Sequence, residues 1–141
     1  MSTEDIISAR RDAAIQKWTE AVFAMYPFET TGFIRTQRDQ FANPVGHATR
    51  AAGDQIYDAV TGRDVDMEKV HASVAALIRI RAVQDLKPEQ AVGVLYLYKS
   101  VLRELLLADM LAAGDVQGFL DMGDRLDTLC LMAFNLYLAD R

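Results

Sequence analysis

Helical periodicity runs through almost the whole chain, and prolines and glycines interrupt it at only a few points. The 141 residues include eight glycines and three prolines, together about 8% against about 12% in an average protein. Apolar residues recur every three or four positions, which places them on one face of a helix. No stretch alternates apolar and polar residues for long enough to predict a strand. The pattern therefore predicts an all-α fold.

The prolines and glycines also indicate where the helices begin and end. Asn43 before Pro44 is typical of a helix start, because asparagine can cap a backbone N–H and proline has no N–H to leave unpaired. Pro88 marks another start in the same way. Gly62 and Gly114 follow apolar periodic stretches, where glycine adopts a left-handed conformation readily. The expected helices are five and span residues 3–26, 44–61, 66–85, 88–113 and 115–139.

A loop of about seventeen residues is expected between the first two helices. Loops of this length are uncommon in compact domains and are often functional or locally helical. Residues 33–41 could form a short helical turn, since Phe33, Gln37 and Phe41 would share one face.

The helix expected over residues 88–113 is apolar on nearly every side, through VGVLYLY (92–98) and again through three leucines at 105–107. Such a helix must lie at the centre of a domain or bury two faces. Adaptable core packing and contact with a second copy of the chain both account for it, and the sequence leaves both open. The chain as a whole is expected to form a single globin-like or bundle domain over residues 1–141.

Composition excludes several classes of protein. The formal net charge is −5, so nucleic acid is not an expected partner. The longest apolar run, Ala91 to Tyr98, is far shorter than the roughly 20 residues that span a bilayer, and residues 1–14 do not resemble a secretory leader. A single cysteine, Cys130, fits a reducing compartment and lies among the apolar residues of the last helix. We expect a cytoplasmic protein with no membrane insertion.

The histidines do not form a recognisable metal site. Glu68 and His71 have the Glu-x-x-His spacing of di-iron bundles, but such sites need two of these steps and two further glutamates. The other histidine, His47, has Pro44 three residues before it, where the second step would need an acid. We therefore expect no metal and no cofactor. One alternative stays open: His71 borders an apolar stripe and could be the proximal ligand of a haem in a globin-like fold.

The arginines that interrupt the helix over residues 66–85 carry the sharpest site prediction. Within LIRIRAV (77–83), Arg81 continues the apolar stripe itself, beside Arg79. A guanidinium on a buried face needs a carboxylate or several carbonyls, or it costs several kcal/mol. Asp85, one turn further on, and Asp39 in the long loop are the candidate partners. The simpler interpretation is an ion-pair network that ties the loop to this helix.

The alternative interpretation is an anion pocket or a protein-docking surface. It would be built from the arginines of the loop and of the helix, with the neighbouring polar residues. The candidate ligand- or partner-binding residues are Arg35, Arg38, Asp39, Asn43, Arg79, Arg81 and Asp85. An enzyme that acts on an anion could be argued only from these arginines and aspartates. Since no catalytic constellation is recognisable, an enzyme is not expected.

Two blocks of sequence carry a family resemblance. They are PFETTGFIRTQRDQFANPVG (27–46) and LIRIRAVQDLKPEQAVGVLYLYK (77–99). In this order they resemble the family of N-terminal domains named after the RsbT co-antagonist RsbRD, and the similarity extends more weakly over nearly the whole chain.

The resemblance implies a globin-like sensory or interaction domain of stress-response regulators or signalling kinases, in which the motif residues are structural or interaction positions and not catalytic ones. Because the chain stops at Arg141 without an output module, we expect a stand-alone role. The expected function is non-enzymatic signalling, through a regulatory protein partner or a small ligand that could be an anion. The protein is expected to be a homodimer, and the alternative function is the haem or cofactor sensor centred on His71.

Overall fold

The computed structural model describes the chain except for residues 27, 38, 40–41, 85 and 141. Its described residues form helices and no strand, which confirms the all-α prediction. The helices are α1 (Thr3–Phe23), α2 (Phe28–Thr36), α3 (Pro44–Val60), α4 (Met67–Ala82), α5 (Pro88–Val92), η1 (Gly93–Tyr96), α6 (Leu97–Leu102), η2 (Arg103–Leu107), α7 (Ala108–Ala112) and α8 (Val116–Asp140). None of the helices in the described part is long and apolar enough to cross a bilayer.

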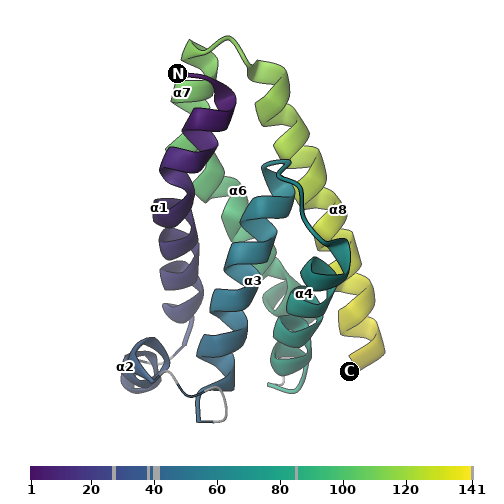
Figure 1. Cartoon of the computed structure of the whole chain (residues 1–141). Coiled ribbons are helices and arrows are strands. Elements are labelled where there is room, and N and C mark those ends of the chain that lie inside the picture. Colours follow the sequence, from purple (N-terminus) through teal and green to yellow (C-terminus); the bar gives the residue numbers. More distant parts are fainter. Residues whose placement is uncertain (27, 38, 40–41, 85, 141) are drawn as a thin grey trace.

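The long helices α1, α3, α4 and α8 pack together with a further segment, Pro88–Ala112, which lies between α1 and α8 (Figure 1). Helix α3 packs against both α1 and α4, and α8 packs against α4, α3 and α5. The buried side chains of this segment include Val94, Leu95, Leu106 and Met110. Of the two arrangements predicted for this apolar stretch, the structure shows the burial of two faces, one against α1 and one against α8.

The Pro88–Ala112 segment is not one regular α-helix, although a single helix was expected there. It has a 3₁₀ turn at Gly93–Tyr96 and a π turn at Arg103–Leu107, with α-helix between and around them. The 3₁₀ turn contains fewer residues than an α-helical turn, and the π turn contains more. Each therefore rotates the buried face after it relative to the buried face before it. Tyr96 is exposed, whereas Tyr98, two residues later, is buried.

Aromatic side chains lock the Pro88–Ala112 segment to α1 and α3. The rings of Trp18 and Tyr98 stack with centroids 4.8 Å apart. The indole N–H of Trp18 donates to the carbonyl of Val94 at 2.8 Å, and the Tyr98 hydroxyl donates to the carbonyl of Gly53 at 2.7 Å. A side chain at Gly53 would place its Cβ 3.2 Å from the Trp18 ring, so glycine allows this close approach.

The helix ends predicted from Asn43, the prolines and the two glycines are confirmed, whereas α1 ends at Phe23 and α4 at Ala82, each three residues before the predicted end. Asn43 caps α3 by accepting from the backbone N–H of Gly46 at 2.9 Å, and Pro44 and Pro88 occupy first-turn positions of their helices. Gly62 and Gly114 have φ values of 84° and 77°, the left-handed conformation expected of them.

The segment between α1 and α3 differs from the expectation. Its helix, α2, spans Phe28–Thr36 and so begins five residues before the turn predicted at 33–41, part of which lies outside the described residues. Asn43 fixes the position of α2, because the side-chain amide of Asn43 donates to the carbonyls of Ile34 (2.7 Å) and Gln37 (3.0 Å). Arg50 adds a 2.7 Å bond to the carbonyl of Arg35. These contacts place α2 beside the ends of α1 and α3.

Candidate functional site

Arg81 is buried, as its place on the apolar stripe predicted, with only 2% of its surface exposed. It donates from Nε to the carbonyl of Ala91 (3.1 Å), from Nη2 to the carbonyl of Gln90 (2.8 Å) and from Nη1 to the hydroxyl of Tyr26 (3.1 Å). Of the two kinds of partner that the sequence left open, the structure thus shows carbonyls. Burial lowers the pKa of this guanidinium. Arg81 ties the end of α4 to the start of α5, and its predicted partner Asp85 lies outside the described residues.

The other predicted binding residues are spread over the lower end of the domain. Arg79 and Asp39 are exposed, and Arg38 lies outside the described residues. Arg35 pairs with Glu20 of α1 at 2.7 Å. It lines a different cavity from the one that Arg81 borders, so the structure does not gather these two arginines around one anion. Their binding roles stay predictions.

His71 lies on the exposed side of α4 and lines none of the cavities described below. Within the described part of the chain, no group of three or more histidine, cysteine or acidic residues could hold a metal ion. His71 thus borders neither of these two cavities, and the haem alternative stays a prediction.

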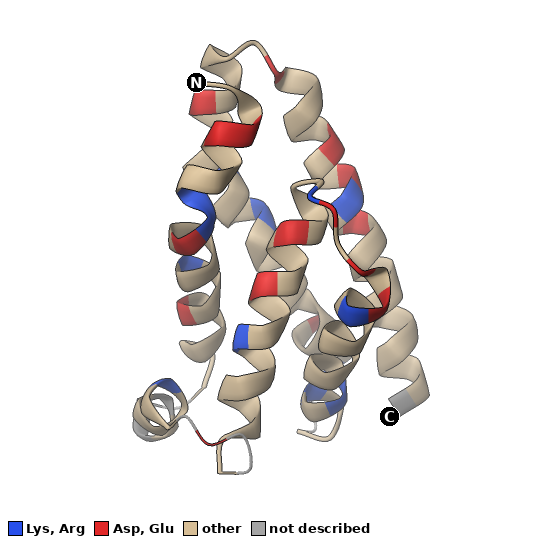
Figure 2. Cartoon of the chain, viewed as in Figure 1, with Lys and Arg blue, Asp and Glu red and all other residues tan. Residues whose placement is uncertain are grey.

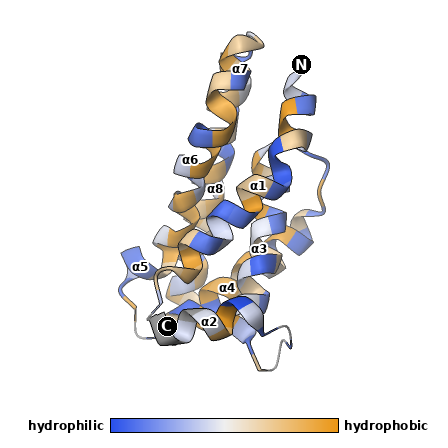
Figure 3. Cartoon of the chain, turned by 90° about the vertical axis from the view of Figure 1, so that its left-hand side faces the viewer, coloured by the Kyte–Doolittle hydropathy of each residue, from blue (hydrophilic) through white to orange (hydrophobic). Residues whose placement is uncertain are grey.

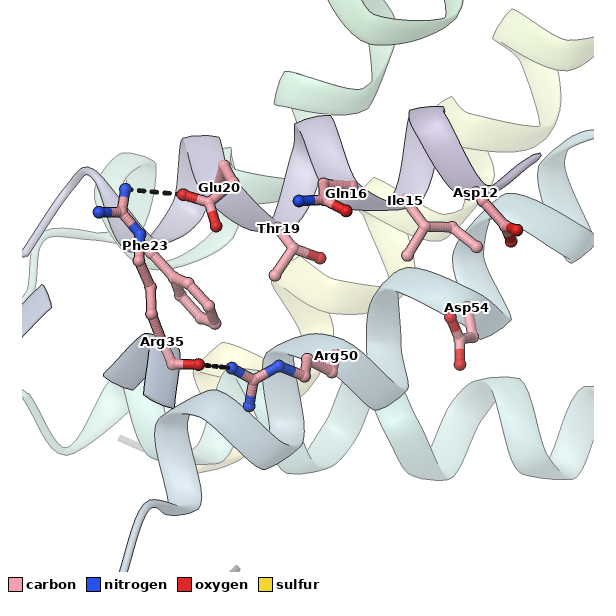
Figure 4. Close-up of a pocket in the computed structure, with 9 residues that line it drawn as sticks. All are labelled: Asp12, Ile15, Gln16, Thr19, Glu20, Phe23, Arg35, Arg50 and Asp54. Atoms are coloured by element: carbon pink, nitrogen blue, oxygen red, sulfur yellow. Dashed lines mark hydrogen bonds and ion pairs between the residues drawn. The ribbon is translucent and has the colours of Figure 1, made fainter. Parts of the chain in front are cut away.

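A polar cleft opens between α1, α2 and α3, with a volume of about 480 Å³ (Figure 4). We call it the α1–α3 cleft. It is lined by Asp12, Ile15, Gln16, Thr19, Glu20, Phe23, Arg35, Arg50 and Asp54. The α1 residues recur every three or four positions, so they form one face of that helix. Figure 3 views the domain from the side of α1 and α2 and shows hydrophilic residues along α1.

The two ends of this cleft carry opposite charge (Figure 4). At one end the Arg35–Glu20 ion pair lies near Arg50, whose guanidinium is 5.3 Å from the centre of the Phe23 ring. At the other end lie Asp12 and Asp54. Partial burial raises the pKa of Asp54, Arg11 opposes this rise, and the carboxylates of Asp58 and Asp12 add smaller upward contributions.

An apolar groove of about 440 Å³ lies on another face of the domain, between the start of the Pro88–Ala112 segment and α8. We call it the α5–α8 groove. It is lined by Pro88, Glu89, Val92, Gly93, Tyr96, Cys130, Leu131 and Phe134. Burial raises the pKa of the Cys130 thiol to about 11, so the thiol stays protonated at neutral pH.

Comparison with known families decides which family this is. The family model described as "RsbT co-antagonist protein rsbRD N-terminal domain" matches residues 12–141, nearly the whole chain. The chain belongs to this family. The resemblance drawn from the two sequence blocks is thereby confirmed, and the RsbRD N-terminal domain is a regulatory domain of stress-response signalling. No curated protein and no solved structure matches the chain significantly.

Sequence reasoning missed most of the residues that line the α1–α3 cleft and the α5–α8 groove of the RsbRD N-terminal domain, although it singled out Arg35. In the α1–α3 cleft, Thr19, Arg50 and Asp54 were not singled out, because a polar stripe on a helix reads as a solvated face. In the α5–α8 groove, Leu131 and Phe134 were overlooked for the opposite reason, since they merge with the core residues of α8. A usable signal was present in the second case: no charged residue occurs from Thr128 to Ala139.

Proposed function

We propose that this RsbRD N-terminal domain is a non-enzymatic regulatory module that forms a homodimer through α8 and the α5–α8 groove. The dimer would present its remaining surface to a regulatory protein partner. Family membership supports the regulatory role. One observation carries the choice of surface, namely a continuous apolar face on α8 that none of the described residues covers.

This α8 face consists of Leu131, Phe134 and Leu138, with Tyr96 of η1 beside it. These side chains are between 43% and 69% exposed. The three α8 residues are spaced by three and four positions, so they form one stripe. Residues 128–139 carry no charge, and the C-terminal half of α8 is accordingly tan in Figure 2. Depletion of charge and enrichment of aromatic residues are typical of the cores of protein interfaces.

A second copy of the chain fits this face because the face contains both a groove and protruding side chains that could fill the same groove on another copy. A two-fold interface joins the same patch on both subunits, so the patch must complement itself. The α5–α8 groove supplies the hollow, and the exposed side chains of Leu131 and Phe134 on its border supply the protrusions. Two copies of α8 that cross at this stripe would each place apolar side chains in the groove of the other.

The charges around the face are also mixed in sign. Lys99 and Asp127 form an exposed 3.5 Å ion pair, and Lys87 and Glu89 lie at the start of α5. A two-fold arrangement can set lysines against acidic residues without bringing large areas of like charge together. This matters for a chain whose formal net charge is −5.

The protonation state of the Cys130 thiol supports the proposal that the domain is not an enzyme. Cys130 is buried, free of any disulfide and protonated at neutral pH, so it lacks the thiolate that nucleophilic chemistry requires. A free buried thiol also supports a cytoplasmic location. Action without an attached output module stays a prediction.

Size-exclusion chromatography with light scattering tests the homodimer. We expect the purified domain to run at twice the mass of one chain at about 10 μM, which requires a dissociation constant of about 1 μM or below, or a binding free energy of about −8 kcal/mol. Phe134→Lys puts a charge into the proposed interface, and we expect it to run as a monomer.

The matched control is Leu111→Lys on α7, because Leu111 is similarly exposed (49% against 43% for Phe134) and lies away from the α8 face. We expect this variant to stay dimeric. A wild-type monomer, or equal effects of the two substitutions, would contradict the proposal.

A further inference from the structure

We infer that a cavity beside Arg81 binds a small aliphatic monocarboxylate, whose carboxylate pairs with the Arg81 guanidinium. The cavity lies between the residues that follow α1 and the connection from α4 to α5, and its volume is about 380 Å³. We call it the Arg81 cavity. It is lined by Met25, Tyr26, Arg81, Gln84, Leu86 and Gln90. The α5–α8 groove shares none of these residues, so the inference does not rest on the proposed homodimer.

The charge of Arg81 provides the first observation. Arg81 is 2% exposed, and its three hydrogen bonds go to two carbonyls and a hydroxyl, which are uncharged groups. No carboxylate in the described part of the chain forms an ion pair with Arg81. Burial of a charge is costly unless an opposite charge accompanies it, and burial is the cause of the lowered pKa of Arg81. The cavity therefore borders a buried positive charge that an anion would stabilise.

The hydrogen-bond donors around the cavity provide the second observation. A guanidinium has five N–H groups, and three of those of Arg81 are used within the chain, which leaves two for a ligand. The Tyr26 hydroxyl, which accepts from Arg81, donates to Oε1 of Gln84 at 3.0 Å. This bond occupies the acceptor of the Gln84 amide, and the amide nitrogen bonds to no described residue.

Gln90 repeats this arrangement at the start of α5. Its Oε1 accepts from the backbone N–H of Lys87 at 3.0 Å, and its amide nitrogen likewise bonds to no described residue. The cavity thus presents a positive charge with two further amide donors. A carboxylate, which only accepts hydrogen bonds, matches this set of groups.

The rest of the lining decides the class of anion. No acidic side chain is among the described residues that line the cavity. The single guanidinium balances the one negative charge of a carboxylate, whereas a phosphate group carries up to two. Met25, which is 50% exposed, and Leu86 supply apolar surface that an aliphatic chain would remove from water. The volume of about 380 Å³ falls within the range of small-molecule sites. The ligand class is therefore a carboxylate with a short aliphatic chain.

Isothermal titration of the full chain with hexanoate tests this inference. Hexanol has the carbon chain without the charge, acetate has the charge without the chain, and inorganic phosphate is a competing anion. We expect hexanoate to bind at least ten times more tightly than each of these three. Burial of about two methylene groups accounts for a tenfold preference over acetate. No binding of hexanoate, or equal or tighter binding of any of the three, would overturn the inference.

Variants test whether hexanoate binds in the Arg81 cavity. Gln84→Glu keeps an oxygen that can accept from Tyr26 but places a negative charge in the cavity, so we expect it to weaken hexanoate binding at least tenfold. Gln90→Glu introduces the same charge at an exposed position, where the fold tolerates it, and should weaken binding several-fold.

The matched control is Gln117→Glu, because Gln117 is exposed at the start of α8 and lies outside the cavity. It makes the same change in net charge and should bind hexanoate as the wild type does. If Gln84→Glu and Gln90→Glu both bind with wild-type affinity, or if Gln117→Glu weakens binding as much as they do, the inference is wrong. None of the three residues belongs to the α8 face or lines the α5–α8 groove, so failure of this test is distinct from failure of the homodimer.

Discussion

Replacing Arg81 with methionine should destabilise the domain substantially. Methionine keeps a long apolar side chain in the same space but removes the guanidinium, which leaves the carbonyls of Gln90 and Ala91 and the hydroxyl of Tyr26 without this donor. A hydrogen bond to a charged group is worth about 1.5–3 kcal/mol. Three such bonds exceed the several kcal/mol that burial of the charge costs. We expect a net loss of about 3 kcal/mol in the free energy of unfolding.

Urea denaturation followed by tryptophan fluorescence measures this loss directly. Trp18 is the only tryptophan and is fully buried, so its emission reports unfolding of the core. The corresponding fall in melting temperature is about 10 °C for a domain of this size. Arg79→Met is the matched control, because Arg79 is exposed on the same helix, and it should cost less than about 1 kcal/mol. If Arg81→Met is as stable as the wild type or more stable, the guanidinium is only tolerated and does not hold α4 to α5.

Three further substitutions have expected outcomes. Thr19→Val should stabilise the domain by about 1 kcal/mol in the same urea assay, because it removes a buried hydroxyl without a partner; a loss of stability would show that the hydroxyl is satisfied in solution. Asn43→Ala should cost about 2 kcal/mol and speed amide hydrogen exchange in α2, because Asn43 bonds α2 and caps α3; unchanged exchange would mean that other contacts hold α2. The raised pKa of Asp54 means that the folded state binds this proton more tightly than the unfolded state. Its contribution to stability is therefore present at low pH and lost as the pH rises above about 4. Asp54→Asn should flatten the fall in melting temperature across this range, and an unaltered pH profile would contradict the shift.

The sequence was sufficient for the helices whose ends have local signals. Asn43, Pro44, Pro88 and the two left-handed glycines act through their own backbone and side chains, so their effects are readable without a fold. The burial of Arg81 was also readable, because the apolar stripe on either side of it is continuous.

Features that depend on distant contacts were not predictable in the same way. Helix α2 is short, and hydrogen bonds from Asn43 and Arg50 hold it in place. The sequence of residues 28–36 contains no signal that predicts these bonds. The partners of Arg81 follow from how α5 crosses the end of α4, which local periodicity does not specify.

The candidate sites show the same division. The polar face of α1 and the side of α3 that carries Arg50 and Asp54 look like ordinary solvated surfaces until the two helices are placed next to each other. The charge-free end of α8 was visible in the sequence. Only the packing of α5 and η1 against it separates the buried Cys130 and Ala133 from the exposed Leu131 and Phe134.

Contacts between protomers test the central claim most directly. Mixing isotope-labelled and unlabelled domain and recording isotope-filtered nuclear Overhauser effects detects only proton pairs that belong to different chains. We expect such pairs to link Leu131 and Phe134 of one protomer with Pro88 and Val92 of its partner. Absence of intermolecular pairs at millimolar concentration, or pairs confined to other faces of the domain, would contradict the account.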